Sequence, residues 1–215
     1  MKHPINLALT PGAEDGIGPT VLLKAIELYN PPDPINYFWC ADKESLKTAA
    51  LKAEVSLRFL DDQALINQKN IFFMTVSETD LLRRQAIFLQ NSIELAQKNH
   101  IQAVVTGPID KRALAFFNES YPGQTEYFAH HLGVDKPFMA FMGGPFIMSL
   151  VTTHLPLCQV SQVLSKNYFY DHLLSVEKHC RLIIGKKPKI LVLGLNPHAG
   201  EHGLLGHEEN EIMRP

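Results

Sequence analysis

Two histidines follow apolar runs of the sequence and could hold a metal ion. His154 lies in "TTHLPL", and His198 lies in "LGLNPHAG", directly after the apolar run "KILVLGL". An imidazole at the end of a buried strand needs a partner, and histidine is a common metal ligand. Catalytic zinc sites usually have three protein ligands, of which two are identified here. His202 and His207 are further candidates by proximity, and a structural hydrogen bond is the alternative for each histidine.

Three loops are candidates for binding an anion. The loop "TPGAEDGIGP" (10–19) is rich in glycine, which permits close backbone approach, although it is neither G-x-G-x-x-G nor a P-loop. Lys111 in "TGPIDK" could reach an anion in a cleft, although a solvated lysine is the more common case. Thr125 in "YPGQTEYF" is expected at a helix N-cap, where its hydroxyl and the nearby amides could hold a phosphate. A plain cap is the alternative for Thr125.

Composition excludes several classes of protein. The chain has 215 residues and a formal net charge of −2, and its scattered basic residues give no footprint for nucleic acid or an anionic membrane. No apolar run approaches the ~20 residues of a spanning helix, and the N-terminus lacks a signal-peptide pattern. Three cysteines at unrelated spacings favour reduced thiols over disulfides. We therefore expect a soluble, cytoplasmic, globular protein.

The elements that must position these residues alternate between strands and helices. Pro19 is expected at the first position of a helix, Asp42 at an N-cap, Asn167 at another, and Gly133 at a C-cap. Gly143–Gly144 indicates a hairpin between two apolar strands. The remaining strands are expected at 5–10, 35–40, 55–60, 71–74, 101–106 and 189–195, and the helices at 19–29, 43–53, 79–100, 125–132 and 167–185.

This alternation, with unbroken apolar strands, predicts an α/β fold with a mostly parallel sheet covered on both faces. Ligands in open α/β sheets collect beyond the carboxyl ends of the strands, which is where the candidate loops fall. The sequence contains no internal repeat and no low-complexity tract.

Taken together, "TPGAEDGIGP", "TGPIDK", "PGQTEYF", "TTHLPL" and "LGLNPHAGEHG" resemble, in order and spacing, the 4-hydroxythreonine-4-phosphate dehydrogenase family of vitamin B6 biosynthesis. The resemblance covers essentially the whole chain, and the last two motifs are quite specific. It implies a two-subdomain α/β/α fold of the isocitrate and isopropylmalate dehydrogenase type, with subdomains at 1–130 and 131–215. That fold does not use the Rossmann fingerprint, in agreement with the missing G-x-G-x-x-G.

The resemblance also implies a reaction. The family oxidises the C3 hydroxyl of 4-phosphohydroxy-L-threonine with NAD or NADP, and the β-keto acid then loses CO2. His154 and His198 match two of the family's three ligands for a divalent metal (Zn, Mg, Co or Mn), which lowers the pKa of the hydroxyl. Gln124 and Thr125 fall on a His-Thr pair that contacts the phosphorylated substrate. Together with Lys111, the candidate from its own loop, they are the predicted substrate-binding residues. The family active sites lie near the interface of a homodimer.

Three departures from the family pattern bear on activity. Gln124 replaces a histidine and cannot carry charge, and Ala13 removes a carboxylate from the first loop. Family members continue well beyond Pro215, and the continuation holds the third metal histidine, in a Tyr-His-Asp-Gln-Gly motif, and much of the nicotinamide pocket. We therefore expect this fold to be incomplete at the C-terminus, to expose apolar sheet edges and to have little or no activity.

Two other functions are consistent with these residues. One is a non-catalytic remnant that binds phosphate or metal without turnover. The other is a metal-dependent hydrolase that uses His154 and His198 with His202 or His207. The hydrolase requires one of the later histidines to point into the same cleft as the first two.

Overall fold

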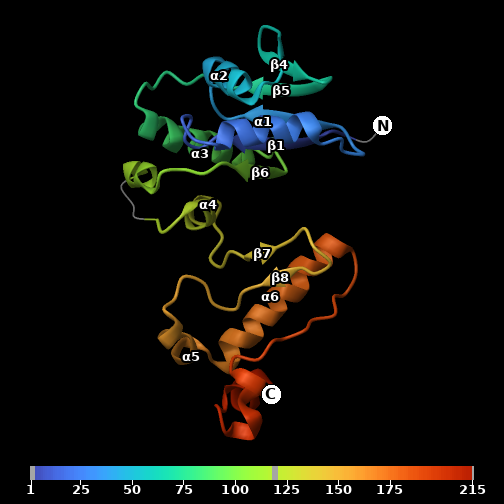
Figure 1. Cartoon of the computed structure of the whole chain (residues 1–215), viewed down its shortest axis with the longest axis vertical. Helices are drawn as coiled ribbons and strands as arrows, with labels where there is room; N and C mark the ends of the chain where they lie inside the picture. The colour runs from blue at the N-terminus through green and yellow to red at the C-terminus, as the bar shows by residue number, and fades with distance from the viewer. Residues whose placement is uncertain (1–2, 118–120, 215) are drawn as a thin grey trace. The chain divides into compact units, whose positions relative to one another are not determined.

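The chain divides into two compact units, Met1–Asp135 and Lys136–Pro215. The computed structural model in Figure 1 describes residues 3–117 and 121–214. The division predicted between residues 130 and 131 would fall inside helix α4 (Gln124–His131), which lies wholly in the first unit. Within the described ranges, no helix is long and apolar enough to cross a membrane.

The first unit is built on a six-stranded sheet with the order β3-β4-β5-β2-β1-β6. Four of the six strands, β5, β2, β1 and β6, run parallel to one another. The sheet continues beyond β5 with β4 and β3, each of which is antiparallel to its neighbour. The strands are β1 (Ile5–Thr10), β2 (Ile35–Trp39), β3 (Arg58–Phe59), β4 (Gln63–Ile66), β5 (Lys69–Phe73) and β6 (Ala103–Thr106). The helices between them are α1 (Gly18–Leu28), α2 (Lys43–Ala53) and α3 (Leu81–Gln97), and the short 3₁₀ helix η1 (Lys111–Phe117) follows β6.

Helices cover both faces of this sheet at its centre. The chain moves from β1 through α1 to β2 and through α2 to β5, so right-handed crossovers place α1 and α2 together on one face. The return through α3 to β6 runs the opposite way and places α3 on the other face. Ala8, Leu9 and Thr10 are consecutive and all buried, as the central strand of a covered sheet requires.

The predicted strand 101–106 is shorter and less buried than expected. It forms as β6 from Ala103, and Val105 is 40% exposed. The reason is its place at the edge of the sheet, where β1 is its only partner among the strands of residues 3–117 and 121–214.

Side-chain caps start helices α2 and α3 of this unit, and the cap of α2 is the one that the sequence predicts. Pro19 stands in the first turn of α1. The Asp42 carboxylate accepts a hydrogen bond from the Ser45 amide at 2.8 Å and caps α2. Asp80 caps α3 in the same way, by accepting from the amides of Leu82 and Arg83.

Strand β4 is the one element of this sheet that the sequence analysis missed. It forms a tight hairpin with β5, in which Ile66 pairs with Lys69 across the two-residue turn Asn67–Gln68. Both turn residues have positive φ, 47° and 69°, as a type I′ turn requires. Glycine is the usual second residue of such a turn, and glutamine in its place removed the signal.

The second unit contains one long helix, α6 (Lys166–Ile184), a short helix α5 (Val160–Val163) and a two-stranded antiparallel ribbon. The ribbon joins β7 (Ala140–Phe141) to β8 (Met148–Ser149), so the predicted hairpin forms with strands of only two residues. The N-cap predicted at Asn167 is wrong, because Ser165 caps α6 by accepting from the Tyr168 amide. Gly185 ends the helix with φ +70°.

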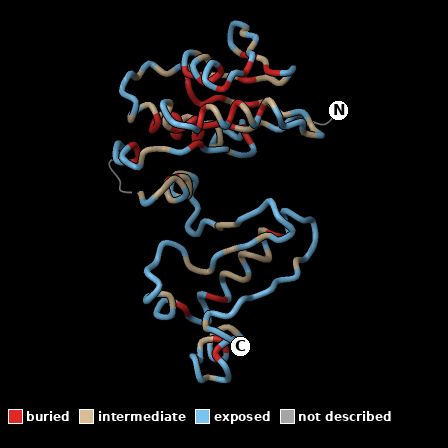
Figure 2. Tube along the Cα trace, viewed as in Figure 1, coloured by how far each residue is buried: buried red, intermediate tan, exposed pale blue. Residues whose placement is uncertain are grey.

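The strand predicted at 189–195 does not form. No strand is assigned to these residues, and Leu191 and Leu193 are 85% and 79% exposed. A strand needs a neighbour to satisfy its backbone hydrogen bonds, and in the described part of this unit only β7 and β8 pair. Figure 2 shows the wider pattern, in which buried residues gather in the first unit and most of the second is exposed or intermediate.

Candidate functional site

The first candidate site lies at the carboxyl edge of the parallel strands, where the direction of the chain reverses. Strand β1 is flanked by β2 on one side and β6 on the other, so the loops after β1 and after β6 leave the sheet side by side. Such a switch point is the usual place for a ligand in an open α/β sheet. The loop after β1 is residues 11–17, and the loop after β6 is residues 107–110.

These two loops pack backbone against backbone. The Gly107 amide donates to the Thr10 carbonyl at 2.7 Å, and the Ala13 amide donates to the Pro108 carbonyl at 2.9 Å. A Cβ added to Gly12 would lie 2.1 Å from the Pro108 carbonyl oxygen, and one added to Gly107 would lie 2.4 Å from that of Pro11. The glycines are therefore explained by the close contact between the backbones of the two loops.

The N-terminus of α4 joins these loops. Gln124 Nε2 donates to the Gly107 carbonyl at 3.2 Å, and Gln124 Oε1 is buried without a hydrogen-bond partner among the described residues. The N-cap predicted at Thr125 is wrong, because the N-cap is Gly123 and Thr125 is the second residue of the helix. Glycine has no side chain that could cap the first amides of the helix. Thr125 is exposed. A helix start without a side-chain cap presents free amides that suit an anion.

Lys111 begins η1 directly after the second loop and is exposed. Its neighbour Asp110 binds the Arg112 guanidinium, which lowers the pKa of Asp110 to about 2 and keeps that carboxylate ionised. The Asp110 amide donates to Gln85 Oε1 of α3 at 2.8 Å, which fixes the loop just before Lys111. The structure thus brings Gln124 to the loop that precedes Lys111.

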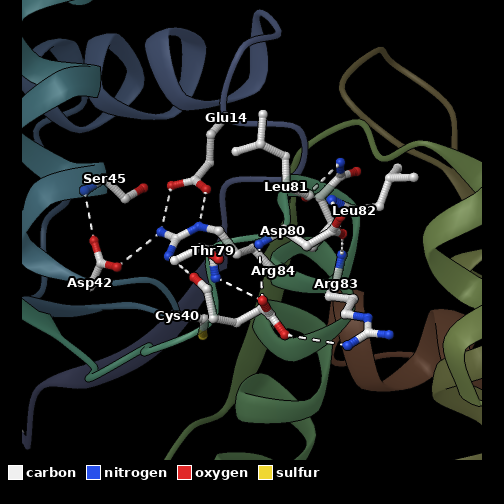
Figure 3. Close-up of polar contacts among 12 residues, drawn as sticks. Glu14, Cys40, Asp42, Ser45, Thr79, Asp80, Leu81, Leu82, Arg83 and Arg84 are labelled. Atoms are coloured by element: carbon white, nitrogen blue, oxygen red, sulfur yellow. Dashed lines mark hydrogen bonds and ion pairs between the residues drawn. The ribbon is translucent and has the colours of Figure 1, made fainter.

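A cluster of charges behind the first loop escaped the sequence analysis (Figure 3). Arg84 of α3 binds both carboxylate oxygens of Glu14 and, at 2.9 Å, Asp42 Oδ2. The Arg84 and Glu14 side chains are only 11% and 15% exposed. The hydrogen bonds that Arg84 donates to Glu14 raise the pKa of Arg84 above its usual range. The available signal was an arginine near a helix N-terminus, where the helix dipole disfavours a cation unless carboxylates offset it.

The histidines proposed as metal ligands lie in loops of the second unit. His154 and His198 are both exposed and adopt left-handed backbone conformations, with φ +57° and +51°. Asn196 closes the loop that carries His198. Its backbone amide donates to Glu209 Oε1 at 2.6 Å, and its side-chain Nδ2 donates to Glu208 Oε2 at 2.8 Å. All residues from 198 to 202 have positive φ. Each histidine is therefore accessible to a ligand from solvent.

The described residues do not by themselves form a complete metal site. No group of three His, Cys, Asp or Glu side chains within these ranges lies close enough together to hold a metal ion. Two imidazoles fall short of the three protein ligands that a catalytic metal usually has. The hydrolase hypothesis required His202 or His207 to form such a group with His154 and His198. The described residues contain no such group, so they do not support the hydrolase.

Comparison with known proteins identifies the family. Residues 35–215 match the sequence model of "Pyridoxal phosphate biosynthetic protein PdxA". The 4-hydroxythreonine-4-phosphate dehydrogenase of Xanthomonas oryzae is 31% identical over 98% of this chain and 68% of its own length. A putative D-threonate 4-phosphate dehydrogenase of Oceanobacillus iheyensis is 30% identical over the same shares.

The fold agrees with this relationship. The crystal structure of a 4-hydroxythreonine-4-phosphate dehydrogenase from Burkholderia phymatum superimposes on the whole chain with a TM-score of 0.76 and 26% sequence identity. The chain covers 70% of that structure. The chain therefore belongs to the PdxA family of pyridoxal phosphate biosynthetic proteins, a family of dehydrogenases.

Proposed function

We propose that this protein takes part in the NAD- or NADP-dependent oxidation of 4-phosphohydroxy-L-threonine. The C3–H bond gives a hydride to the nicotinamide and the C3 hydroxyl gives a proton to the medium. The resulting β-keto acid then releases CO2 and takes up a proton at C2, which leaves an amino-ketone phosphate. The names of the relatives support the dehydrogenase chemistry and the phosphorylated substrate. From the resemblance in sequence we further propose an isocitrate dehydrogenase-type fold and a homodimer, and the three free cysteines favour a cytoplasmic location.

The observation that carries the proposal is the meeting of three elements at the switch point of the first sheet. The loops 11–17 and 107–110 pack together there, and the start of α4 is hydrogen-bonded to the second of them. We assign the substrate phosphate to the amides of the first turn of α4, with the Thr125 hydroxyl beside them. Gln124 has a second N–H beyond the one bound to Gly107, and Lys111 adds a positive charge. Binding at the phosphate would orient the reacting carbons from a distance.

His154 and His198 are proposed as two ligands of a divalent metal. Their exposure and their position in closed or strained loops support this assignment. Because the described residues supply no third ligand, we derive no chemical step through the metal.

Binding and turnover are best tested separately on the 215-residue chain. Calorimetry would measure the affinity for 4-phosphohydroxy-L-threonine and for D-threonate 4-phosphate. Reduction of NAD⁺ or NADP⁺ would measure turnover with Zn²⁺, Mn²⁺, Co²⁺ or Mg²⁺. We expect Lys111→Ala and Gln124→Ala to weaken substrate binding, and we expect Lys136→Ala, which removes an exposed lysine of the second unit, to leave it unchanged.

The outcomes separate the hypotheses. Metal-dependent turnover would show that the chain is a working dehydrogenase, and preference for D-threonate 4-phosphate would move the proposal to that substrate. Binding without turnover would favour the non-catalytic function. Equal binding by the wild-type, Lys111→Ala and Gln124→Ala proteins would exclude the proposed phosphate site. Loss of metal binding in His154→Ala and His198→Ala, with Glu201→Ala as a control from the same loop, would support the two ligands.

A further inference from the structure

Arg84 connects three loops at the carboxyl edge of the first sheet. Its guanidinium binds the Glu14 carboxylate in the loop after β1 and the Asp42 carboxylate that caps α2. A third contact, at 2.8 Å, goes to the Glu78 carbonyl in the segment before α3. A planar guanidinium with several fixed donors suits this arrangement, and a lysine ammonium could not reproduce it.

Glu14 transmits this anchoring to the candidate site. The loop that carries Glu14 also carries Gly12 and Ala13, which pack on Pro108. The Glu14 carbonyl accepts a further hydrogen bond from Lys52 Nζ at 3.1 Å, so both the side chain and the backbone of Glu14 are held. The Glu14 carboxylate therefore points to Arg84 and serves as an anchor for the loop.

The next residue of α3 holds the second loop. Gln85 is 4% exposed and spans from the Leu81 carbonyl to the Asp110 amide. Adjacent residues of one helix thus fix the two loops that meet at the switch point. Gly107 lies in the second loop and accepts the hydrogen bond from Gln124.

We infer that Arg84 is a positioning residue of this site: through Glu14 it holds loop 11–17 against loop 107–110, and so sets the place of Gln124 and Lys111. The inference rests on the proposed function for its link to substrate. The anchoring itself is a statement about the loops and is tested without any assay of activity.

Hydrogen exchange on the full chain provides that test. The Ala13 and Gly107 amides donate across the contact between the loops, so their exchange reports on it directly. We expect Arg84→Gln and Glu14→Gln each to speed exchange at these two amides by about tenfold, the usual size of a lost charge-assisted hydrogen bond. The double variant should exceed neither single variant by much, because both remove the same interaction. Arg83→Gln is the matched control, since Arg83 is mostly exposed, lies 3.9 Å from Glu78 and packs over the Phe116 ring without a contact to Glu14.

A purely structural role would give a different result. If Arg84 only adds stability, its substitution would speed exchange at the amides of β1 and β2 by the same factor as at Ala13 and Gly107. The urea midpoint would also fall. That outcome would overturn the inference. Exchange at the Ala13 and Gly107 amides that is no faster in Arg84→Gln than in Arg83→Gln would overturn it as well.

Calorimetry with 4-phosphohydroxy-L-threonine separates this inference from the proposed function. An affinity about tenfold weaker in Arg84→Gln and Glu14→Gln, with an unchanged urea midpoint, would support both. Faster loop exchange in the variants, together with no binding by the wild-type protein, would support the positioning role and overturn the proposed function. Unchanged affinity despite faster loop exchange would show that the loops do not set the substrate site, and would overturn the inference.

Discussion

Gly107 illustrates how a single residue is constrained by a neighbouring loop. Its Cα faces the backbone of residues 10 and 11, and a Cβ there would lie 2.4 Å from the Pro11 carbonyl oxygen. Backbone atoms cannot move aside as a flexible side chain can, so an added methyl group must displace one loop from the other.

We expect Gly107→Ala to lower the free energy of unfolding of the first unit by about 2–3 kcal/mol, the cost of overpacking a tight contact. Trp39, which is fully buried in this unit, provides the fluorescence signal for urea unfolding. Gly16→Ala is the control in the neighbouring loop, because its Cβ would approach no atom closer than 3.2 Å. Equal effects of the two substitutions would contradict the packing explanation.

In the second unit, His172 is a partly buried histidine whose surroundings shift its pKa. Its Nε2 lies 3.2 Å from Ser149 Oγ, which itself donates to the Met139 carbonyl at 3.0 Å. Because the serine proton is already used, the imidazole donates and the serine is not activated as a nucleophile. Burial lowers the pKa of His172 below 6.5.

The second unit should therefore lose stability in mild acid. The unfolded chain binds the proton more tightly than the folded chain, so this contribution is complete above pH 6.5 and decreases as the pH falls below it. We expect His172→Gln, which keeps a hydrogen-bond donor, to lose less stability than the wild type between pH 8 and pH 5.5. Urea midpoints from circular dichroism would measure the difference. A larger acid loss in His172→Gln would reverse the sign and refute the argument.

At the scale of elements, capping decides where α6 begins. The sequence "LSKNYF" offers both Ser165 and Asn167 as caps, and both residue types are favoured at N-caps. Ser165 has the extended backbone of an N-cap, with φ −132° and ψ 163°, and accepts from the Tyr168 amide. Asn167 lies within the first turn, where its side chain is exposed.

We expect Ser165→Ala to destabilise the second unit by about 1 kcal/mol through the loss of this cap. Asn167→Ala should change stability by less than about 0.5 kcal/mol, because alanine is a better helix former and no cap is lost. Thermal unfolding of the two variants compares them directly. A larger effect of Asn167→Ala would show that α6 begins two residues later than described.

At the scale of the whole molecule, apolar side chains are distributed unequally between the two units. The first unit has a continuous core around Trp39, Leu23 and Phe88, formed by the sheet and its helices. In the second unit only Leu164, Phe169 and Cys180 are buried hydrophobic residues within the described range. Its apolar segment 190–195 contributes no core in this structure.

We therefore expect the double substitution Leu191→Lys and Leu193→Lys to change the free energy of unfolding by less than about 0.5 kcal/mol and to increase solubility. Leu9→Lys is the contrasting variant, because Leu9 is 3% exposed in β1 and a buried charge should prevent folding. Circular dichroism and size-exclusion chromatography distinguish the cases. Loss of folding in the double variant would show that these leucines are buried in the assembled protein.

Local sequence was sufficient for most elements of the first unit. Pro19, Asp42 and the alternating apolar positions of α3 act through contacts within a few residues, so the helices and the strands β1 and β2 could be predicted. The resemblance in five motifs was likewise enough for the family, and it pointed to Gln124 and Thr125, while Lys111 came from its own loop. Local signals failed where two choices were chemically equivalent, as at Ser165 and Asn167, or where a turn lacked its usual glycine, as at Gln68.

Tertiary structure alone decided how the loops meet and which apolar runs become strands. The contact between Gly12 and Pro108 and the bonds of Arg84 to Glu14 and Asp42 join residues distant in sequence, and each depends on the strand order that places β1 beside β6. The run 189–195 has the composition of a strand, but a strand exists only where another backbone accepts its hydrogen bonds. Composition determines which residues can be buried or paired, and the arrangement of the whole chain determines which partners they find.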